Sequence, residues 1–170
     1  MHQFSTPDNA IVAMSTNPPT YLVSSYLPPY DSLAQDLTPI ETFLDSVKPV
    51  NLMWSLDAKS KHSLWHSPHI DTRDRALVDF LSLHSLVTAS ENDGSNFPGA
   101  LGNSWIHITI TTTNSAKRVQ NWRISEEETQ SDHNLILFTL MPSYISSNCA
   151  RKTSNSTRKY ATRAGNWNLF

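Results

Sequence analysis

Apolar residues in this chain switch repeatedly between strand-like and helix-like spacing, and this switching constrains the fold more than any other feature. Ile106, Ile108 and Ile110 alternate with polar residues, which predicts a strand with one buried face. Further strands are predicted at Ile11–Ala13, Tyr21–Ser25, Val50–Leu56, Leu86–Ala89, Val119–Ser125 and Leu135–Leu140. Strands interleaved with helices predict a layered α/β fold.

Two helices are predicted between these strands. Thr38-Pro39-Ile40-Glu41 combines a capping Thr, a Pro at the first helical position and a Glu three residues after the cap, so a helix is expected to begin there. Its apolar face would consist of Ile40, Phe43, Leu44 and Val47. A second helix is predicted to open at Thr72 and to bury Leu77, Val78 and Leu81.

Composition narrows the class of protein. A length of 170 residues fits one domain with a substantial core. Cys149 is the single cysteine, which excludes an internal disulfide and a cysteine-rich zinc module and fits a reducing, intracellular compartment. Because no apolar run approaches the roughly 18 residues of a membrane span, no membrane association is expected.

Charge is distributed unevenly along the chain. Residues 1–150 carry all 15 acidic residues and eight of the 13 basic ones, a net charge of −7, whereas the last twenty residues carry a charge of +5. The Ser- and Asn-rich stretch Ser143–Thr157 is typical of a linker. We therefore predict a folded domain over residues 1–142 and a basic polar linker over residues 143–170.

Four polar motifs lie near the ends of predicted strands, where α/β folds place their sites. They are Ser25-Tyr26-Leu27-Pro28-Pro29, Ser55-Leu56-Asp57-Ala58-Lys59, Ser104-Trp105-Ile106-His107 and Ser131-Asp132-His133. In this order they resemble the endonuclease/exonuclease/phosphatase superfamily, and in particular the apurinic-endonuclease-like domain of arthropod non-LTR retrotransposons. The resemblance runs from about residue 9 to the C-terminus, where Lys159-Tyr160-Ala161-Thr162-Arg163 is similar to the connector toward a reverse transcriptase domain.

The resemblance implies a four-layer α/β sandwich of two mixed sheets flanked by helices. It implies a DNA endonuclease that hydrolyses a phosphodiester with Mg²⁺ or Mn²⁺ and nicks target DNA in the nucleus to prime reverse transcription. It also implies that this chain begins after the first half of such a domain, so that apolar faces lack partners and the polypeptide is poorly stable. No small-molecule cofactor is implied.

Individual roles follow from the matching positions. Asp57 would orient or deprotonate the attacking water, and His133 would donate a hydrogen bond to the scissile phosphate. Tyr26 would reach the phosphate from the opposite wall, and Asp132 would help to hold the metal. Ser131 would shape the turn that presents Asp132 and His133.

Two departures from the family fall on this chemistry. Lys59 replaces an Asn that donates to the phosphate, and His107 replaces an Asp that orients the histidine and favours its charged form. Since an imidazole supplies no negative charge, a large loss of activity is expected. The alternative interpretation is a non-catalytic remnant or adopted fragment that binds DNA or a protein partner, with the basic tail as the contact.

One further cluster has metal-ligand spacing. His62, His66 and His69 are separated by four and three residues, a spacing that on a helix would suit zinc. Because Pro68 disfavours a regular helix there, a loop is expected instead.

Overall fold

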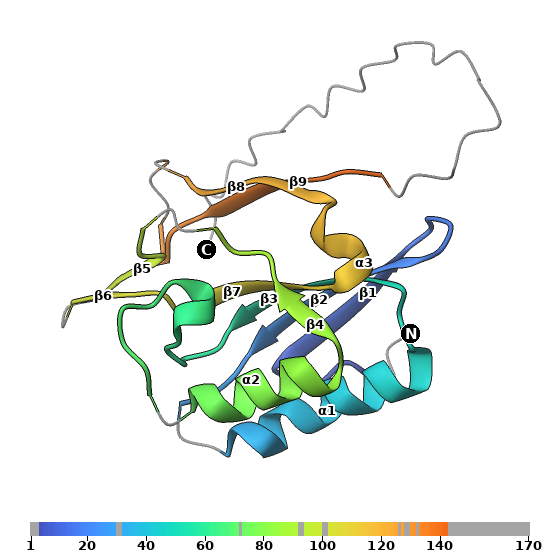
Figure 1. Ribbon diagram of the computed structural model, residues 1–170, viewed down its shortest axis with the longest axis horizontal. Coiled ribbons are helices and arrows are strands. Elements are labelled where there is room, and N and C mark those ends of the chain that lie inside the picture. The colour runs from blue at the N-terminus through green and yellow to red at the C-terminus, as the bar shows by residue number, and fades with distance from the viewer. Residues whose placement is uncertain are drawn as a thin grey trace, which may run out of the picture.

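The computed structural model describes residues 4–142 except 30–31, 72, 92–93, 100–101, 126, 128–129 and 132 (Figure 1). The predicted linker, residues 143–170, lies outside the described residues. No helix in the described part of the chain is long and apolar enough to cross a membrane.

A five-stranded mixed sheet forms the centre of the molecule. In sheet order its strands are β1 (Asn9–Met14), β2 (Thr20–Tyr26), β3 (Asn51–Asp57), β7 (His107–Thr112) and β4 (Leu86–Thr88). β2 and β3 are parallel, and the other neighbours are antiparallel. The predicted N-terminal hairpin is therefore present as β1 and β2, and the predicted buried strand as β3.

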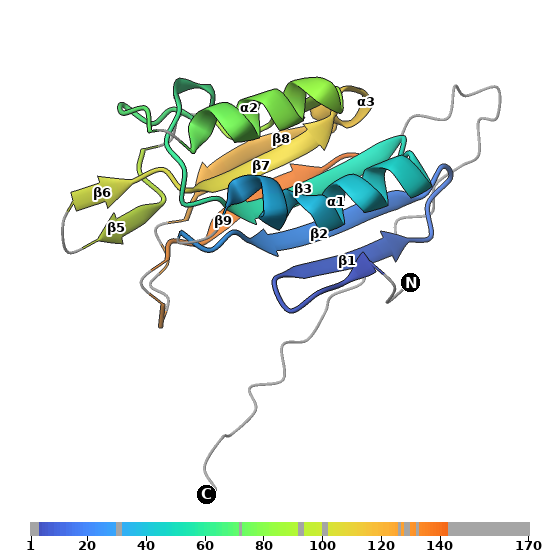
Figure 2. The ribbon, with the colours of Figure 1, turned by 90° about the horizontal axis from the view of Figure 1, so that it is seen from below.

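Two helices cover one face of this sheet. α1 (Leu33–Val47) and α2 (Asp74–Leu83) lie side by side across it (Figure 2). α1 connects the parallel strands β2 and β3, so these three elements form a β-α-β unit. Trp54, Phe43 and Leu77 are almost completely buried between the helices and the sheet, and this layer contains the main hydrophobic core.

The predicted start of the first helix is wrong. α1 begins at Leu33 after the N-cap Ser32, and Pro39 lies inside it. The hydroxyl of Thr38 donates to the carbonyl of Ala34 at 3.1 Å rather than capping a helix. Leu33 and Leu37 continue the buried stripe of the helix toward its N-terminus, and their burial outweighs the preference of Pro for a first turn. For the second helix, Thr72 lies outside the described residues.

A two-stranded sheet covers part of the opposite face. It consists of β8 (Val119–Ile124) and β9 (Ile136–Leu140), which pair antiparallel (Figure 1). The short helix α3 (Thr113–Ala116) connects β7 to β8. Because this sheet lies over β7, Thr109 and Thr111 are buried as well as Ile108 and Ile110, so the prediction of one buried face for this strand is wrong. The indole of Trp122 donates to the hydroxyl of Thr109 at 2.9 Å across the interface.

The remaining elements lie at the end of the central sheet where Asp57 is located. They are η2 (Ser63–Trp65) and the strand pair β5 (Phe97–Gly99) and β6 (Gly102–Ser104). The predicted α/β fold is thus confirmed. Only the central sheet is mixed, however, because the β8–β9 sheet is antiparallel. In the described residues the second sheet has two strands, and the helices α1 and α2 lie only on the far face of the first sheet.

Candidate active site

Asp57 and His107 occupy the strand ends at one edge of the central sheet. Asp57 is the last residue of β3, His107 is the first residue of β7, and the two are directly opposite each other in the antiparallel register. Side chains on one face of a sheet alternate, so partners in register project from the same face. That face is the one on which β8 and β9 lie.

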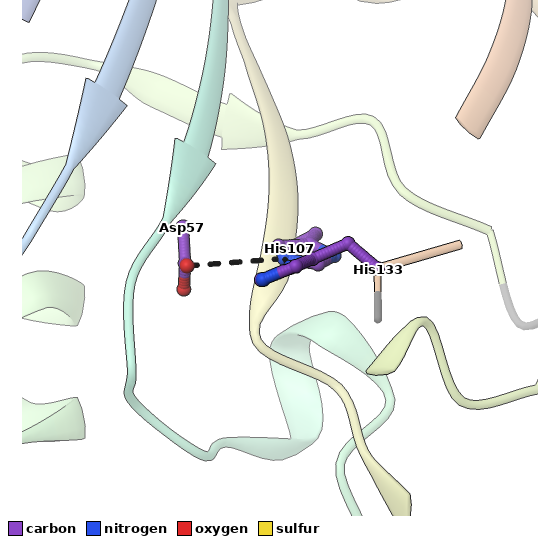
Figure 3. Close-up of side chains that lie close together, drawn as sticks. All are labelled: Asp57, His107 and His133. Carbon is purple, nitrogen blue, oxygen red and sulfur yellow. Dashed lines mark hydrogen bonds and ion pairs between the residues drawn. The ribbon is translucent and has the colours of Figure 1, made fainter. Parts of the chain in front are cut away.

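His133 joins this pair from the segment between β8 and β9. Figure 3 shows its imidazole beside that of His107, with both rings directed toward Asp57. His133 Nδ1 lies 2.6 Å from His107 Nε2, and His107 Nε2 lies 3.9 Å from Asp57 Oδ2. One potential ligand atom from each residue lies within 4.8 Å of the others. The tertiary structure thus brings the predicted Asp57 and His133 together, with His107 between them.

A buried asparagine holds the backbone of this cluster in place. The Asn96 side-chain oxygen accepts hydrogen bonds from the backbone N–H groups of Ile106 and His107, both at 3.0 Å. Its amide nitrogen donates to the carbonyl of His107 at 2.8 Å, and its own backbone carbonyl accepts from the N–H of Asn134 at 3.3 Å. Asn96 therefore ties the start of β7 to the residue that follows His133.

Phe97 packs against both imidazoles. Its ring centroid lies 4.8 Å from that of His133 and 6.4 Å from that of His107. Neither Asn96 nor Phe97 was expected from the sequence. The motifs contain neither residue, and their importance follows from contacts with residues that are distant in the chain.

Lys59 places a positive charge against the carboxylate. Its Nζ atom lies 3.2 Å from Asp57 Oδ2 and 5.0 Å from the centroid of the Phe97 ring. The backbone of Lys59 is left-handed, with φ of 46°, a conformation that Asn adopts more readily than Lys. The Asn that the resemblance leads one to expect at this position would therefore relieve backbone strain as well as remove the charge.

Burial lowers the pKa of the His107 imidazole below its ordinary value of about 6.5. The nearby His133 and Lys59 lower this pKa further, whereas Asp57 acts in the opposite direction. His107 is therefore neutral at neutral pH and cannot supply the negative charge of the Asp that the resemblance leads one to expect at this position.

A cavity of about 350 Å³ opens beside the cluster, between the two sheets. Asp57 and His107 line it together with Ser55, Asn134 and Phe138. The Oδ1 atom of Asp57 is buried and has no hydrogen-bond partner among the described residues. This oxygen is available to accept a hydrogen bond or to bind a cation.

Two of the other predicted site residues lie near this cluster, and the third lies outside the described residues. Tyr26 is opposite Asp57 in the parallel register of β2 and β3, and its side chain is 43% exposed. Ser131 Oγ accepts a hydrogen bond from the N–H of His133 at 3.2 Å. Asp132, the predicted metal ligand, lies outside the described residues.

The histidines near Pro68 are engaged elsewhere. His62 accepts a hydrogen bond from the N–H of Leu64 and lies 3.7 Å from Asp74, while His66 Nε2 contacts the carbonyl of Ser90 at 3.1 Å. The segment forms η2 and loop structure, as expected. Within the described part of the chain, only Asp57, His107 and His133 form a group of three potential metal ligands.

These three residues do not fit Mg²⁺. This ion prefers carboxylate, carbonyl and water oxygens in octahedral geometry. The cluster offers one carboxylate and two imidazoles, and the Lys59 ammonium group already lies against that carboxylate. The expected Mg²⁺ chemistry therefore has no complete ligand set among the described residues.

Residues 20–137 match a protein family described as endonuclease-reverse transcriptase. No curated protein sequence matches the chain.

Many solved structures are similar to the chain, among them the following two. The endonuclease domain of TRAS1, a telomere-specific non-LTR retrotransposon, superposes with a TM-score of 0.76 at 26% identity over 82% of this chain. A variant of the 3′ phosphatase NExo from Neisseria, bound to a product DNA hairpin, superposes with a TM-score of 0.59 at 13% identity over 80% of this chain, a likeness of fold. The chain covers 66% of each of these two structures.

Proposed function

The chain belongs to the endonuclease-reverse transcriptase family, and we propose that the Asp57–His133 site hydrolyses phosphodiester bonds in DNA, at a rate strongly reduced by His107 and Lys59. The convergence of Asp57 and His133, together with the cavity that Asp57 and His107 line, carries this proposal. The retrotransposon origin of one structural relative and the DNA bound to the other favour DNA as the substrate. The biological role would be the nicking of target DNA in the nucleus.

Asp57 is the residue suited to handle the attacking water. Its buried Oδ1 atom has no hydrogen-bond partner among the described residues, so it can accept a hydrogen bond and then a proton from water in the cavity. Lys59 limits this role because its ammonium group lies 3.2 Å from Oδ2 of the same carboxylate and competes with water for it.

His133 is the residue suited to stabilise the charge that develops on the phosphate. A cationic imidazole donates from both ring nitrogens, and such donors stabilise a transition state most when their charge is held in place. The contact between His133 Nδ1 and His107 Nε2 orients the ring. However, His107 is neutral, so, unlike a carboxylate, it supplies no negative charge beside the His133 ring. Tyr26, on the neighbouring strand, would donate its hydroxyl to the same phosphate.

The loss of that carboxylate explains why weak activity is expected. In a Ser-His-Asp hydrolase, replacing the Asp by Asn lowers kcat by about 10⁴-fold. We expect a loss of similar order here, because a neutral side chain likewise replaces an acid next to the functional histidine. Family members generally depend on a divalent metal, and the poor fit of Mg²⁺ to the described cluster would reduce activity further.

Nicking of supercoiled plasmid, in buffer with Mg²⁺ or Mn²⁺, tests this function. The wild-type chain should nick little, whereas the double variant His107→Asp/Lys59→Asn should nick at least about 100-fold faster, within the range of general acid–base effects. Adding Asp57→Ala to the double variant should return nicking to the wild-type level. His69→Ala, at an exposed histidine outside the cluster, is the matched control.

Two outcomes would contradict the proposal. If the double variant nicks no faster than the wild type, His107 and Lys59 are not what limits hydrolysis. If the wild type nicks rapidly and loses that activity on Asp57→Ala or His133→Ala, the site is hydrolytic but not impaired.

A further inference from the structure

We propose that Asp57, His107 and His133 form a binding site for Zn²⁺. This inference goes beyond DNA hydrolysis, because it concerns which cation the described residues bind and requires no turnover. The same three residues fit Mg²⁺ poorly, since two of the three offer nitrogen rather than oxygen.

The donor set matches Zn²⁺. Two imidazole nitrogens and one carboxylate oxygen form a common protein ligand set for this ion, with a water or substrate in the fourth position. Imidazole suits borderline transition metals, whereas Mg²⁺ prefers oxygen ligands. With His107, the site therefore offers an imidazole nitrogen where an Asp would have offered carboxylate oxygens.

The distances between the donors are close to those that zinc requires. Zinc lies about 2.0–2.2 Å from nitrogen and oxygen ligands, so tetrahedral ligand atoms are about 3.3–3.5 Å apart. The two imidazole nitrogens are 2.6 Å apart, and the distance from His107 Nε2 to Asp57 Oδ2 is 3.9 Å. Adjustments of less than about 1 Å bring both pairs to this spacing. Rotation of the three side chains about their own bonds can supply such adjustments.

The surroundings of the cluster favour an ion. Asp57 Oδ1 is buried and without a hydrogen-bond partner in the described part of the chain, and an ion held by this carboxylate would compensate for the group's loss of water. Asn96 fixes the backbone on both sides of the His107 peptide, and the Phe97 ring restricts both imidazoles. The adjoining cavity leaves room for a fourth ligand.

Lys59 is the group that opposes binding. Its ammonium nitrogen lies 3.2 Å from Asp57 Oδ2 and repels a dication at the same carboxylate. Zinc binding requires Lys59 to move away from Asp57, and its partly exposed side chain can do so. Removal of this charge should therefore strengthen binding, a gain that misfolding of a variant would not produce.

Titration of the tag-free, full-length chain with Co²⁺, followed by visible absorption, tests the proposal. We expect one Co²⁺ per chain with the intense absorption of a tetrahedral site, displaced by equimolar Zn²⁺ but not by a large excess of Mg²⁺. Asp57→Asn and His107→Ala should each weaken binding by more than about 100-fold. This exceeds the loss of about 10- to 100-fold that follows removal of a group that only contacts a metal ligand. Lys59→Met should strengthen it at least about tenfold, and His69→Ala should leave it unchanged.

The proposal is overturned if no Co²⁺ or Zn²⁺ binds, or if binding is insensitive to both Asp57→Asn and His107→Ala. It is also overturned if His69→Ala abolishes the absorption, because the ion would then lie elsewhere. Circular dichroism of each variant shows whether the chain is folded. The tighter binding expected for Lys59→Met is a further safeguard, because misfolding would weaken binding and not strengthen it. Since the readout is absorption, failure of zinc binding is distinguishable from failure of DNA hydrolysis.

Discussion

At the scale of single residues, His107 determines how the site behaves with pH. It faces Asp57, Lys59 and His133, and burial lowers its pKa below about 6.5. Near the ordinary pKa, the unfolded chain therefore binds more protons at this residue than the folded chain does. Since stability rises with pH wherever the unfolded state binds more protons, His107 stabilises the fold fully above about 6.5 and less as the pH falls below it.

We expect the free energy of unfolding of the metal-free protein to fall more steeply below about pH 6.5 for the wild type than for His107→Gln. Urea denaturation at a series of pH values, in the presence of a chelator, measures this difference. The glutamine variant keeps the backbone contacts with Asn96 and removes only the titration, so superimposable profiles would show that His107 is not responsible.

At the scale of elements, α1 contains a proline that weakens it. Pro39 lies inside the helix and has no N–H to donate to the carbonyl four residues earlier. The buried residues Leu33, Leu37 and Ile40 hold the helix together across this gap. Pro39→Ala should therefore stabilise the protein by about 1–3 kcal/mol, as judged from the helix-interior cost of proline.

Thr38→Ala is the matched comparison for this variant. If Thr38 were the N-cap of a helix, its replacement would cost about 1 kcal/mol. Because its hydroxyl instead bonds to the carbonyl of Ala34 within the helix, the change should be close to neutral. Urea denaturation of both variants distinguishes a helix that begins at Leu33 from one capped by Thr38. A destabilised Thr38→Ala variant would favour the start at Thr38.

At the scale of the whole molecule, the second sheet leaves part of the first uncovered. Val12 on β1 and Leu22 on β2 are register partners on the face opposite the helices, and they are 58% and 37% exposed. An exposed apolar patch on a sheet favours self-association. Val12→Thr together with Leu22→Thr should reduce association in light scattering, with unfolding free energy changed by less than about 0.5 kcal/mol per site.

Val23→Thr provides the contrast. Val23 follows Leu22 on β2, but its side chain points into the core and is 3% exposed. A hydroxyl buried there without a partner should cost about 1–3 kcal/mol. Equal changes in unfolding free energy for the substitutions at positions 22 and 23 would contradict this, because they would show that both side chains are buried to the same extent.

The sequence by itself determined the type and order of most elements. Three of these elements follow from local patterns: the alternation of Ile106, Ile108 and Ile110, the apolar run of β3 and the N-terminal hairpin. Such patterns are visible in the sequence because burial of one face of an element places apolar residues at regular intervals. The four motifs likewise indicated the family, because their residues and order are properties of the chain alone.

Only the tertiary structure decided what surrounds these elements. The cover over Thr109, the position of His107 between Asp57 and His133, and the hydrogen bonds of Asn96 depend on residues that meet across strand register and across the two sheets. Such contacts leave no periodic signal, since their partners are set by packing rather than by spacing along the chain. The donor set that favours zinc over magnesium exists only once these segments have folded together.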